Sequence, residues 1–150
     1  MLSLFIKQIC QNIRLNPSNS IVYIQKCFIS RFLIVDDVPE VEIDNSGEFK
    51  YIQVRVTDKN NNNQLKYIVR GDAGSKYHDD IFKKLKEKID VNNISVECIG
   101  GGKMIVDSTK KQINVFGKSD GFGKADHHKT IEILKKKYSN WSIEIGQNDK

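Results

Sequence analysis

The sequence predicts an α+β protein, with a single mixed β-sheet of about six strands and two helices packed on it. Segments of alternating apolar and polar residues, bounded by glycine, asparagine or aspartate turns, recur along residues 36–150, and this period of two is typical of half-buried strands. Two other segments carry apolar residues at helical spacing. The order strand-strand-helix-strand-strand-helix-strand favours helices layered on one sheet.

The length and composition fit one globular domain preceded by a basic segment. A chain of 150 residues can bury a substantial core. The net charge is +5, but residues 1–35 hold four basic residues and no acid, whereas residues 36–150 hold 20 basic and 19 acidic residues. A nucleic-acid-binding domain normally carries its positive charge on the folded part, so no nucleic-acid partner is expected.

Residues 1–35 form a basic amphipathic leader or extension. Apolar residues recur at helical spacing over residues 2–13, and the apolar stretch 21–35 contains Lys26 and Arg31. Each of these charges would cost about 2.5–3.5 kcal/mol at a bilayer centre, so no stable membrane insertion is expected. The pattern fits an organelle transit peptide and equally an extra strand or a disordered extension. Three sparse cysteines favour a reducing compartment, which indicates the cytosol, or the mitochondrion if the leader is a targeting signal.

The strands are placed by alternation and by the turns between them. In chain order, the expected strands are residues 41–44, 49–56, 66–70, 94–99, 112–116 and 141–145. An asparagine-rich loop at residues 58–63 makes a hairpin of the second and third strands. Three glycines, residues 100–102, follow the fourth strand and predict a bulge or a close approach of backbone at its end.

Each of the two expected helices carries a histidine near its first turn. The first runs from Ser75, a plausible N-cap, to Ile89, and places His78 on its apolar face. The second runs over residues 126–137 and places His127 in the same way. Two such histidines could share a polar cleft, or each could be a core histidine satisfied by a backbone carbonyl; the spacing leaves both open.

Glycines and lysines near these helices suggest a place for an anion. The loop Gly117–Gly123 joins a strand to a helix, and such loops can point several backbone N–H groups at one spot. It fits neither the P-loop nor the GxGxxG pattern, and a simple glycine-rich hairpin loop would look alike. Lys103 follows the triple glycine, and Lys50 lies in the middle of a strand.

Several enzyme classes are excluded by their missing motifs. The sequence has no Cys-x5-Arg loop, no Arg-His-Gly string and no HExxH helix, and its candidate metal ligands do not cluster at useful spacing. What remains is a histidine site with amides, glycines and lysines, suited to a phosphoryl group without a metal or other cofactor.

Taken together, these residues resemble the small phosphohistidine phosphatase family, which includes the Janus proteins. The resemblance covers roughly residues 38–146, in order and with few gaps. It rests on Phe49-Lys50-Tyr51, Ile68-Val69-Arg70-Gly71, Tyr77-His78-Asp79-Asp80-Ile81, Cys98-Ile-Gly-Gly-Gly-Lys103, Ile113-Asn-Val-Phe-Gly117, Ser119 and Ala125-Asp-His127.

The resemblance implies removal of phosphate from phosphohistidine, and sometimes phospholysine, on proteins without a metal. It places the catalytic histidine at His78 and the substrate-contacting lysine at Lys50. The phosphate-holding loop corresponds to Ser119, Asp120 and Gly121. The implied partners are phosphorylated proteins, and the chain is expected to be a monomer.

Three further residues are candidates for a supporting role. Arg70 and Lys103 match basic family positions, and His127 is expected to shape or support the cleft. The chain departs from the family pattern at residues 72–74, where an aromatic residue is common, and at Asp120, which we expect to offer its backbone N–H and turn its side chain outward. The alternative function is a non-catalytic module that binds phosphorylated residues; such a module needs the anion site but not His78.

Overall fold

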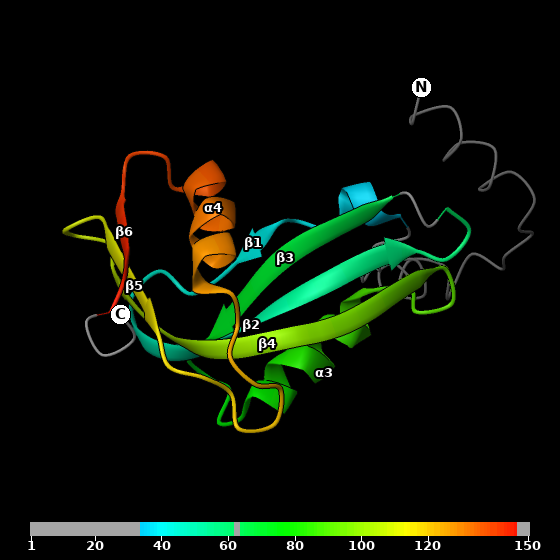
Figure 1. Cartoon of the computed structure of the whole chain (residues 1–150), viewed down its shortest axis with the longest axis horizontal. Helices are drawn as coiled ribbons and strands as arrows, with labels where there is room; N and C mark the ends of the chain where they lie inside the picture. The colour runs from blue at the N-terminus through cyan, green and yellow to red at the C-terminus, as the bar shows by residue number, and fades with distance from the viewer. Residues whose placement is uncertain (1–33, 62–63, 147–150) are drawn as a thin grey trace, which may run out of the picture. The chain divides into compact units, whose positions relative to one another are not determined.

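The computed structural model describes residues 34–61 and 64–146 (Figure 1). The leader predicted for residues 1–35 lies almost wholly outside the described residues, so its nature stays a prediction. None of the helices in the described part of the chain has the length and apolar content that crossing a membrane requires.

Six strands form one mixed sheet. They are β1 (Val41–Glu42), β2 (Gly47–Asp58), β3 (Leu65–Asp72), β4 (Ile94–Asp107), β5 (Gln112–Phe116) and β6 (Ser142–Ile145). Their order across the sheet is β1-β3-β2-β4-β5-β6. The two outer pairs, β1 with β3 and β5 with β6, are parallel, and the inner pairs are antiparallel. The predicted α+β class and mixed sheet are confirmed.

The two α-helices in the described part of the chain cover opposite faces of this sheet (Figure 1). Helix α3 (His78–Lys88) packs on Ile52 and Val54 of β2, and the short 3-10 helix η1 (Val35–Asp37) joins the same cluster. Helix α4 (His127–Lys137) packs on Phe49 and Tyr51 of the same strand. Because successive side chains of a strand point to opposite sides, this alternation gives β2 a separate core on each face, called here the α3 face and the α4 face.

The triple glycine lies inside β4 and not at a strand end as predicted. The strand continues to Asp107, and β2 pairs with it on both sides of a bulge, where Gln53 faces Gly100 but Val54 faces Cys98. The predicted bulge is therefore present beside the glycines, as is the close approach. Added to Gly101, a Cβ atom would lie 2.8 Å from His78 Cδ2 and 2.8 Å from the carbonyl oxygen of Tyr51.

The predicted N-cap of the first helix is wrong, because α3 begins at His78 with Tyr77 as its N-cap. Ser75 instead belongs to a turn organised by Asp72 at the end of β3. The carboxylate of Asp72 accepts hydrogen bonds from the Gly74 N–H at 2.7 Å and the Ser75 hydroxyl at 2.7 Å, and it also pairs with Lys84. The capping role of Ser75 is lost because its hydroxyl is committed to this turn.

Candidate functional site

A cleft opens on the α3 face where helix α3 begins. Its lining comes from β2, β4, the start of α3 and the loop after β5: Lys50, Tyr77, His78, Asp79, Lys103, Lys118, Ser119, Asp120, Gly121 and Phe122. Six of the eight residues singled out from the sequence are among them. The folded chain thus brings together residues as far apart in sequence as Lys50 and Phe122.

His78 is the first residue of α3 and is half-buried at this cleft. The helix start is fixed by the Asp80 carboxylate, which accepts a hydrogen bond from the Tyr77 N–H at 2.9 Å. Nε2 of His78 lies 2.9 Å from the carbonyl oxygen of Gly102. A carbonyl can only accept, so Nε2 carries the proton and, in the neutral ring, Nδ1 keeps its lone pair.

The orientation of the ring leaves Nδ1 available for chemistry. Two atoms of the ring, Cδ2 and Nε2, face β4 at Gly101 and Gly102, so Nδ1 lies on the edge turned away from that strand. The predicted contact between a histidine and a backbone carbonyl is present, but it orients the ring of His78 at a cleft and does not bury it.

Two lysines of the cleft come from neighbouring strands. Lys50 on β2 and Lys103 on β4 are cross-strand partners and therefore share the α3 face. Lys103 pairs with Glu48 at 3.3 Å. Lys50 also lies opposite Asp72 of β3, but that carboxylate is already committed to Lys84 and to the turn before α3.

The ammonium group of Lys50 is therefore available to an anion in the cleft. Within residues 34–61 and 64–146, no ion pair is formed by Lys50. The same commitment of Asp72 lowers the pKa of its carboxyl, first through the hydrogen bond from Lys84 and then through that from Ser75.

The loop after β5 is pinned to β4 and presents backbone amides. The Gly101 N–H donates to the Gly123 carbonyl at 3.1 Å, while Ser119 and Gly123 exchange two backbone hydrogen bonds. The buried Ser119 hydroxyl accepts from the Phe122 N–H at 3.2 Å. The N–H groups of Asp120 and Gly121 donate to no group in the described part of the chain, so both remain available to an anion. The side chain of Asp120 is exposed.

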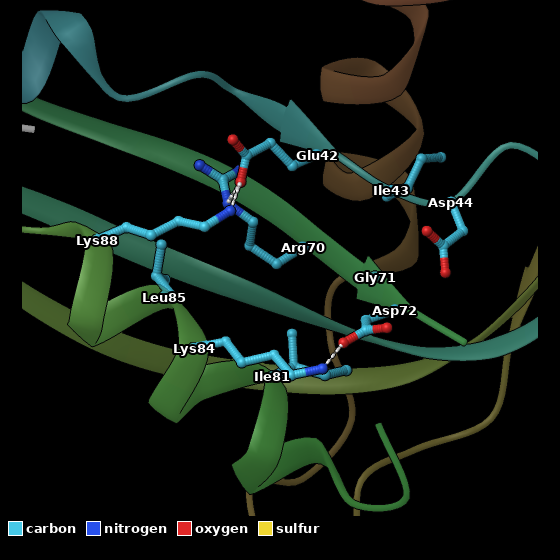
Figure 2. A pocket seen from close by; sticks show the side chains of 10 residues that line it. All are labelled: Glu42, Ile43, Asp44, Arg70, Gly71, Asp72, Ile81, Lys84, Leu85 and Lys88. Atoms are coloured by element: carbon cyan, nitrogen blue, oxygen red, sulfur yellow. Dashed lines mark hydrogen bonds and ion pairs between the residues drawn. The ribbon is translucent and has the colours of Figure 1, made fainter. Parts of the chain in front are cut away.

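Arg70 does not lie in this cleft. It lines a separate pocket between β1, β3 and α3, shown in Figure 2. Its guanidinium donates to the carbonyls of Val69 at 2.9 Å and Pro39 at 2.7 Å, and pairs with Glu42 at 3.2 Å. Burial outweighs that pairing and lowers the Arg70 pKa to about 10, so the residue is charged at neutral pH. Its contacts fasten the segment before β1 to β3.

His127 does not share a cleft with His78. It is 4% exposed at the start of α4, with Nδ1 2.6 Å from the hydroxyl of Tyr51, which is fully buried on the α4 face. The sheet separates the two histidines because α3 and α4 cover opposite faces. Of the two alternatives that the spacing left open, the shared cleft is therefore not formed. His127 instead contacts β2 through the hydroxyl of Tyr51.

Four lining residues were not singled out as site residues by the sequence reasoning: Tyr77, Asp79, Lys118 and Phe122. Lys118 and Phe122 lie within the glycine-rich loop, and Tyr77 and Asp79 flank His78. Adjacency to a candidate residue was the signal that could have found them.

Cys98 is not a second nucleophile of this site. Burial raises the pKa of its thiol to about 11, and the thiol contacts the Gly100 carbonyl, so it is protonated at neutral pH and unreactive. Among the described residues, no three His, Cys, Asp or Glu side chains gather as a metal site would require.

Comparisons with known proteins point to one family. The model of the Janus/Ocnus family matches residues 35–142. Sex-regulated protein janus-A of Drosophila melanogaster is 41% identical over 109 residues, which are 73% of this chain and 79% of that protein. Janus-A of Drosophila pseudoobscura pseudoobscura is 40% identical over 112 residues, or 73% and 75% of the two chains. The 14 kDa phosphohistidine phosphatase of Sus scrofa is 36% identical over 110 residues, or 71% and 87%.

Proposed function

This chain belongs to the Janus/Ocnus family, as its motifs predict, and from that premise we propose that it is a protein histidine phosphatase. The single observation that carries the proposal is the geometry of His78. Its Nε2 is held by the Gly102 carbonyl at 2.9 Å, while Nδ1 is on the opposite edge of the ring, at a cleft that also presents Lys50 and the amides of Asp120 and Gly121. The Sus scrofa relative bears the name 14 kDa phosphohistidine phosphatase.

In the proposed reaction, the lysine and the loop amides hold the phosphoryl group. Phosphoryl transfer has a loose transition state, so positioning and charge stabilisation supply most of the catalysis. Lys50 and the N–H groups of Asp120 and Gly121 are donors of the kind needed at the equatorial oxygens. The start of α3 adds its dipole at the same place.

His78 supplies the reactive atom through one of two routes. In the first, the Nδ1 lone pair attacks phosphorus, the P–N bond of the substrate breaks, its nitrogen gains a proton, and water then hydrolyses the phosphorylated His78. In the second, Nδ1 accepts a proton from water while the water attacks phosphorus, the P–N bond breaks, and the proton passes from Nδ1 to the leaving nitrogen. A rapid acid-free quench with radiolabelled substrate separates them, because only the first leaves label on the protein.

The proposed partners are phosphorylated proteins, and the proposed form is a monomeric, metal-independent enzyme of the cytosol. The alternative is a module that binds phosphorylated residues without hydrolysing them. Phosphate release from a phosphohistidine peptide, measured with the full chain in the presence of a chelator, decides between these. Tight binding of the peptide without any turnover would favour the module.

The comparison of His78→Ala with His127→Ala tests the assignment of the catalytic histidine. If Nδ1 of His78 is the nucleophile, His78→Ala loses more than the roughly 10²–10⁴-fold usual for a general base. His127→Ala keeps most of the turnover per folded molecule, although it loses stability because the buried hydroxyl of Tyr51 loses its hydrogen bond to the imidazole. A folded His78→Ala variant with near wild-type turnover would refute the proposal.

A further inference from the structure

Two aromatic side chains line the cleft and are not used by the proposed chemistry. They are Tyr77, next to His78 in the chain, and Phe122, in the loop after β5; we call them the aromatic rim. Tyr77 is 59% exposed. Its ring is therefore accessible to a ligand that enters the cleft, and an exposed ring beside a candidate catalytic residue can gain free energy when a ligand covers it.

Both residues are held in place by the fold. Phe122 packs edge-to-face on Phe82 of α3, with 5.6 Å between ring centroids, and donates its N–H to the Ser119 hydroxyl. Tyr77 is fixed at its backbone by Asp80, and the Lys76 ammonium lies over its ring at 5.4 Å from the centroid. The ring of Phe122 and the backbone of Tyr77 are therefore in place before a substrate arrives, which lowers the entropic cost of binding.

The phosphate-holding groups cannot tell one phosphorylated nitrogen from another. Lys50 and the amides of Asp120 and Gly121 would meet only the phosphoryl oxygens, which are the same in phosphohistidine and phospholysine. Selection between the two must come from groups that meet the side chain of the substrate beyond the P–N bond. Phosphohistidine presents there a planar ring with a π face, whereas phospholysine presents a flexible chain of methylene groups.

We propose that the aromatic rim receives the imidazole ring of the substrate and makes the cleft selective for phosphohistidine over phospholysine. This inference rests on the proposed function and adds a specificity determinant to it. Aromatic pairs favour offset-stacked or edge-to-face contacts, and each such contact changes an affinity by roughly 2- to 12-fold. The ring of the substrate gains these contacts, and the lysine chain does not.

The test uses the full chain and two peptides of one sequence, carrying either phosphohistidine or phospholysine. The measured quantity is the ratio of their kcat/KM values. Tyr77→Leu removes the ring but keeps an apolar side chain, and Tyr77→Phe is the matched control that keeps the ring. Because Tyr77 is exposed, neither change threatens the fold.

The wild type is expected to prefer phosphohistidine. Tyr77→Leu should lower kcat/KM for phosphohistidine by roughly 2- to 12-fold, mainly through KM, and change that for phospholysine less than about twofold. Tyr77→Phe should keep the wild-type ratio, and Phe122→Leu should behave as Tyr77→Leu does. An equal loss on both peptides, or an unchanged ratio in both leucine variants, overturns the role of the aromatic rim while leaving the phosphatase intact. No turnover of either peptide by the wild type overturns the proposed function, and this inference with it.

Discussion

Replacing Gly101 by alanine should damage catalysis through a single methyl group. A Cβ atom at this position would lie 2.8 Å from His78 Cδ2, 2.8 Å from the Tyr51 carbonyl oxygen and 3.1 Å from Ser119 Cβ. The Tyr51 carbonyl belongs to the paired backbone of β2 and cannot easily yield. The ring of His78 and the loop at Ser119 therefore have to move.

The size of the effect follows from these distances. Carbon atoms in contact prefer about 3.5–4.0 Å, so the ring must retreat by roughly 1 Å. A misplacement of about 1 Å can cost on the order of 10²-fold in rate, and the displaced ring also loses its alignment with the Gly102 carbonyl. Overpacking by one methyl group costs about 1–3 kcal/mol of stability. We expect Gly101→Ala to lose about 10²-fold in kcat while remaining largely folded.

Gly71→Ala is the matched control for overpacking. Its Cβ would lie 2.7 Å from the ring of Phe49, so it strains β3 to a similar degree but outside the His78 cleft. Turnover per folded molecule is measured for both variants with a phosphohistidine peptide, and unfolding midpoints are measured in urea. If both variants keep wild-type turnover per folded molecule, then the close packing of His78 on Gly101 does not set its reactive position.

Four further outcomes are expected. Lys50→Ala should lower kcat/KM by about 10²-fold or more with little change in the unfolding midpoint. Lys103→Ala should lower kcat/KM less, because the ammonium group of Lys103 already pairs with Glu48. Equal kcat/KM for Lys50→Ala and the wild type would mean that Lys50 is an ordinary surface residue. Asp72→Asn should lower the free energy of unfolding by about 1–2 kcal/mol at pH 7. The pKa of Asp72 is lowered in the folded state by Lys84, so the stabilisation is full above the ordinary carboxyl pKa and is lost as the pH falls through the lowered one; urea titrations should show the two proteins converging in acid, and a constant difference would contradict this account. Arg70→Met should lower the free energy of unfolding by about 3–5 kcal/mol, because the hydrogen bonds to the Val69 and Pro39 carbonyls and the Glu42 pair are lost. Turnover per folded molecule should stay unchanged, and a selective loss of turnover would place Arg70 in catalysis. A chain of residues 34–150 should fold and turn over like the full chain, since the sheet, both helices and the cleft all lie within it; a large loss on truncation would make the leader part of the domain.

The sequence by itself determined the elements and most of the residues of the cleft. Periods of two and of 3.6 residues are local properties of the chain, so they located β2, β3, β5, β6 and both of the described helices to within a few residues, whereas β4 runs eight residues past its expected end. The first strand was also expected, although only Val41–Glu42 of it pairs. Lys50, His78 and the loop at Ser119 were identified by their motifs.

Only the tertiary structure decided which of these residues meet. His78 and His127 have the same helical spacing in the sequence, yet they lie on opposite faces because α3 and α4 pack on opposite sides of β2. Local periodicity shows that a helix has an apolar face, but it does not show which face of the sheet receives it. The same limit applies to Arg70, whose contacts with Pro39 and Glu42 depend on the parallel pairing of β1 with β3.

The continuation of β4 through three glycines also depends on tertiary contacts. Glycine has a low intrinsic preference for strands, so the sequence favours an end at Gly100. The strand persists because β2 and the loop after β5 hydrogen-bond to it on either side. The absence of side chains there lets His78, Tyr51 and Ala125 approach the backbone closely. The triple glycine is evident in the sequence. The reason for it is evident only in the structure, which shows the atoms that occupy the space where side chains would otherwise lie.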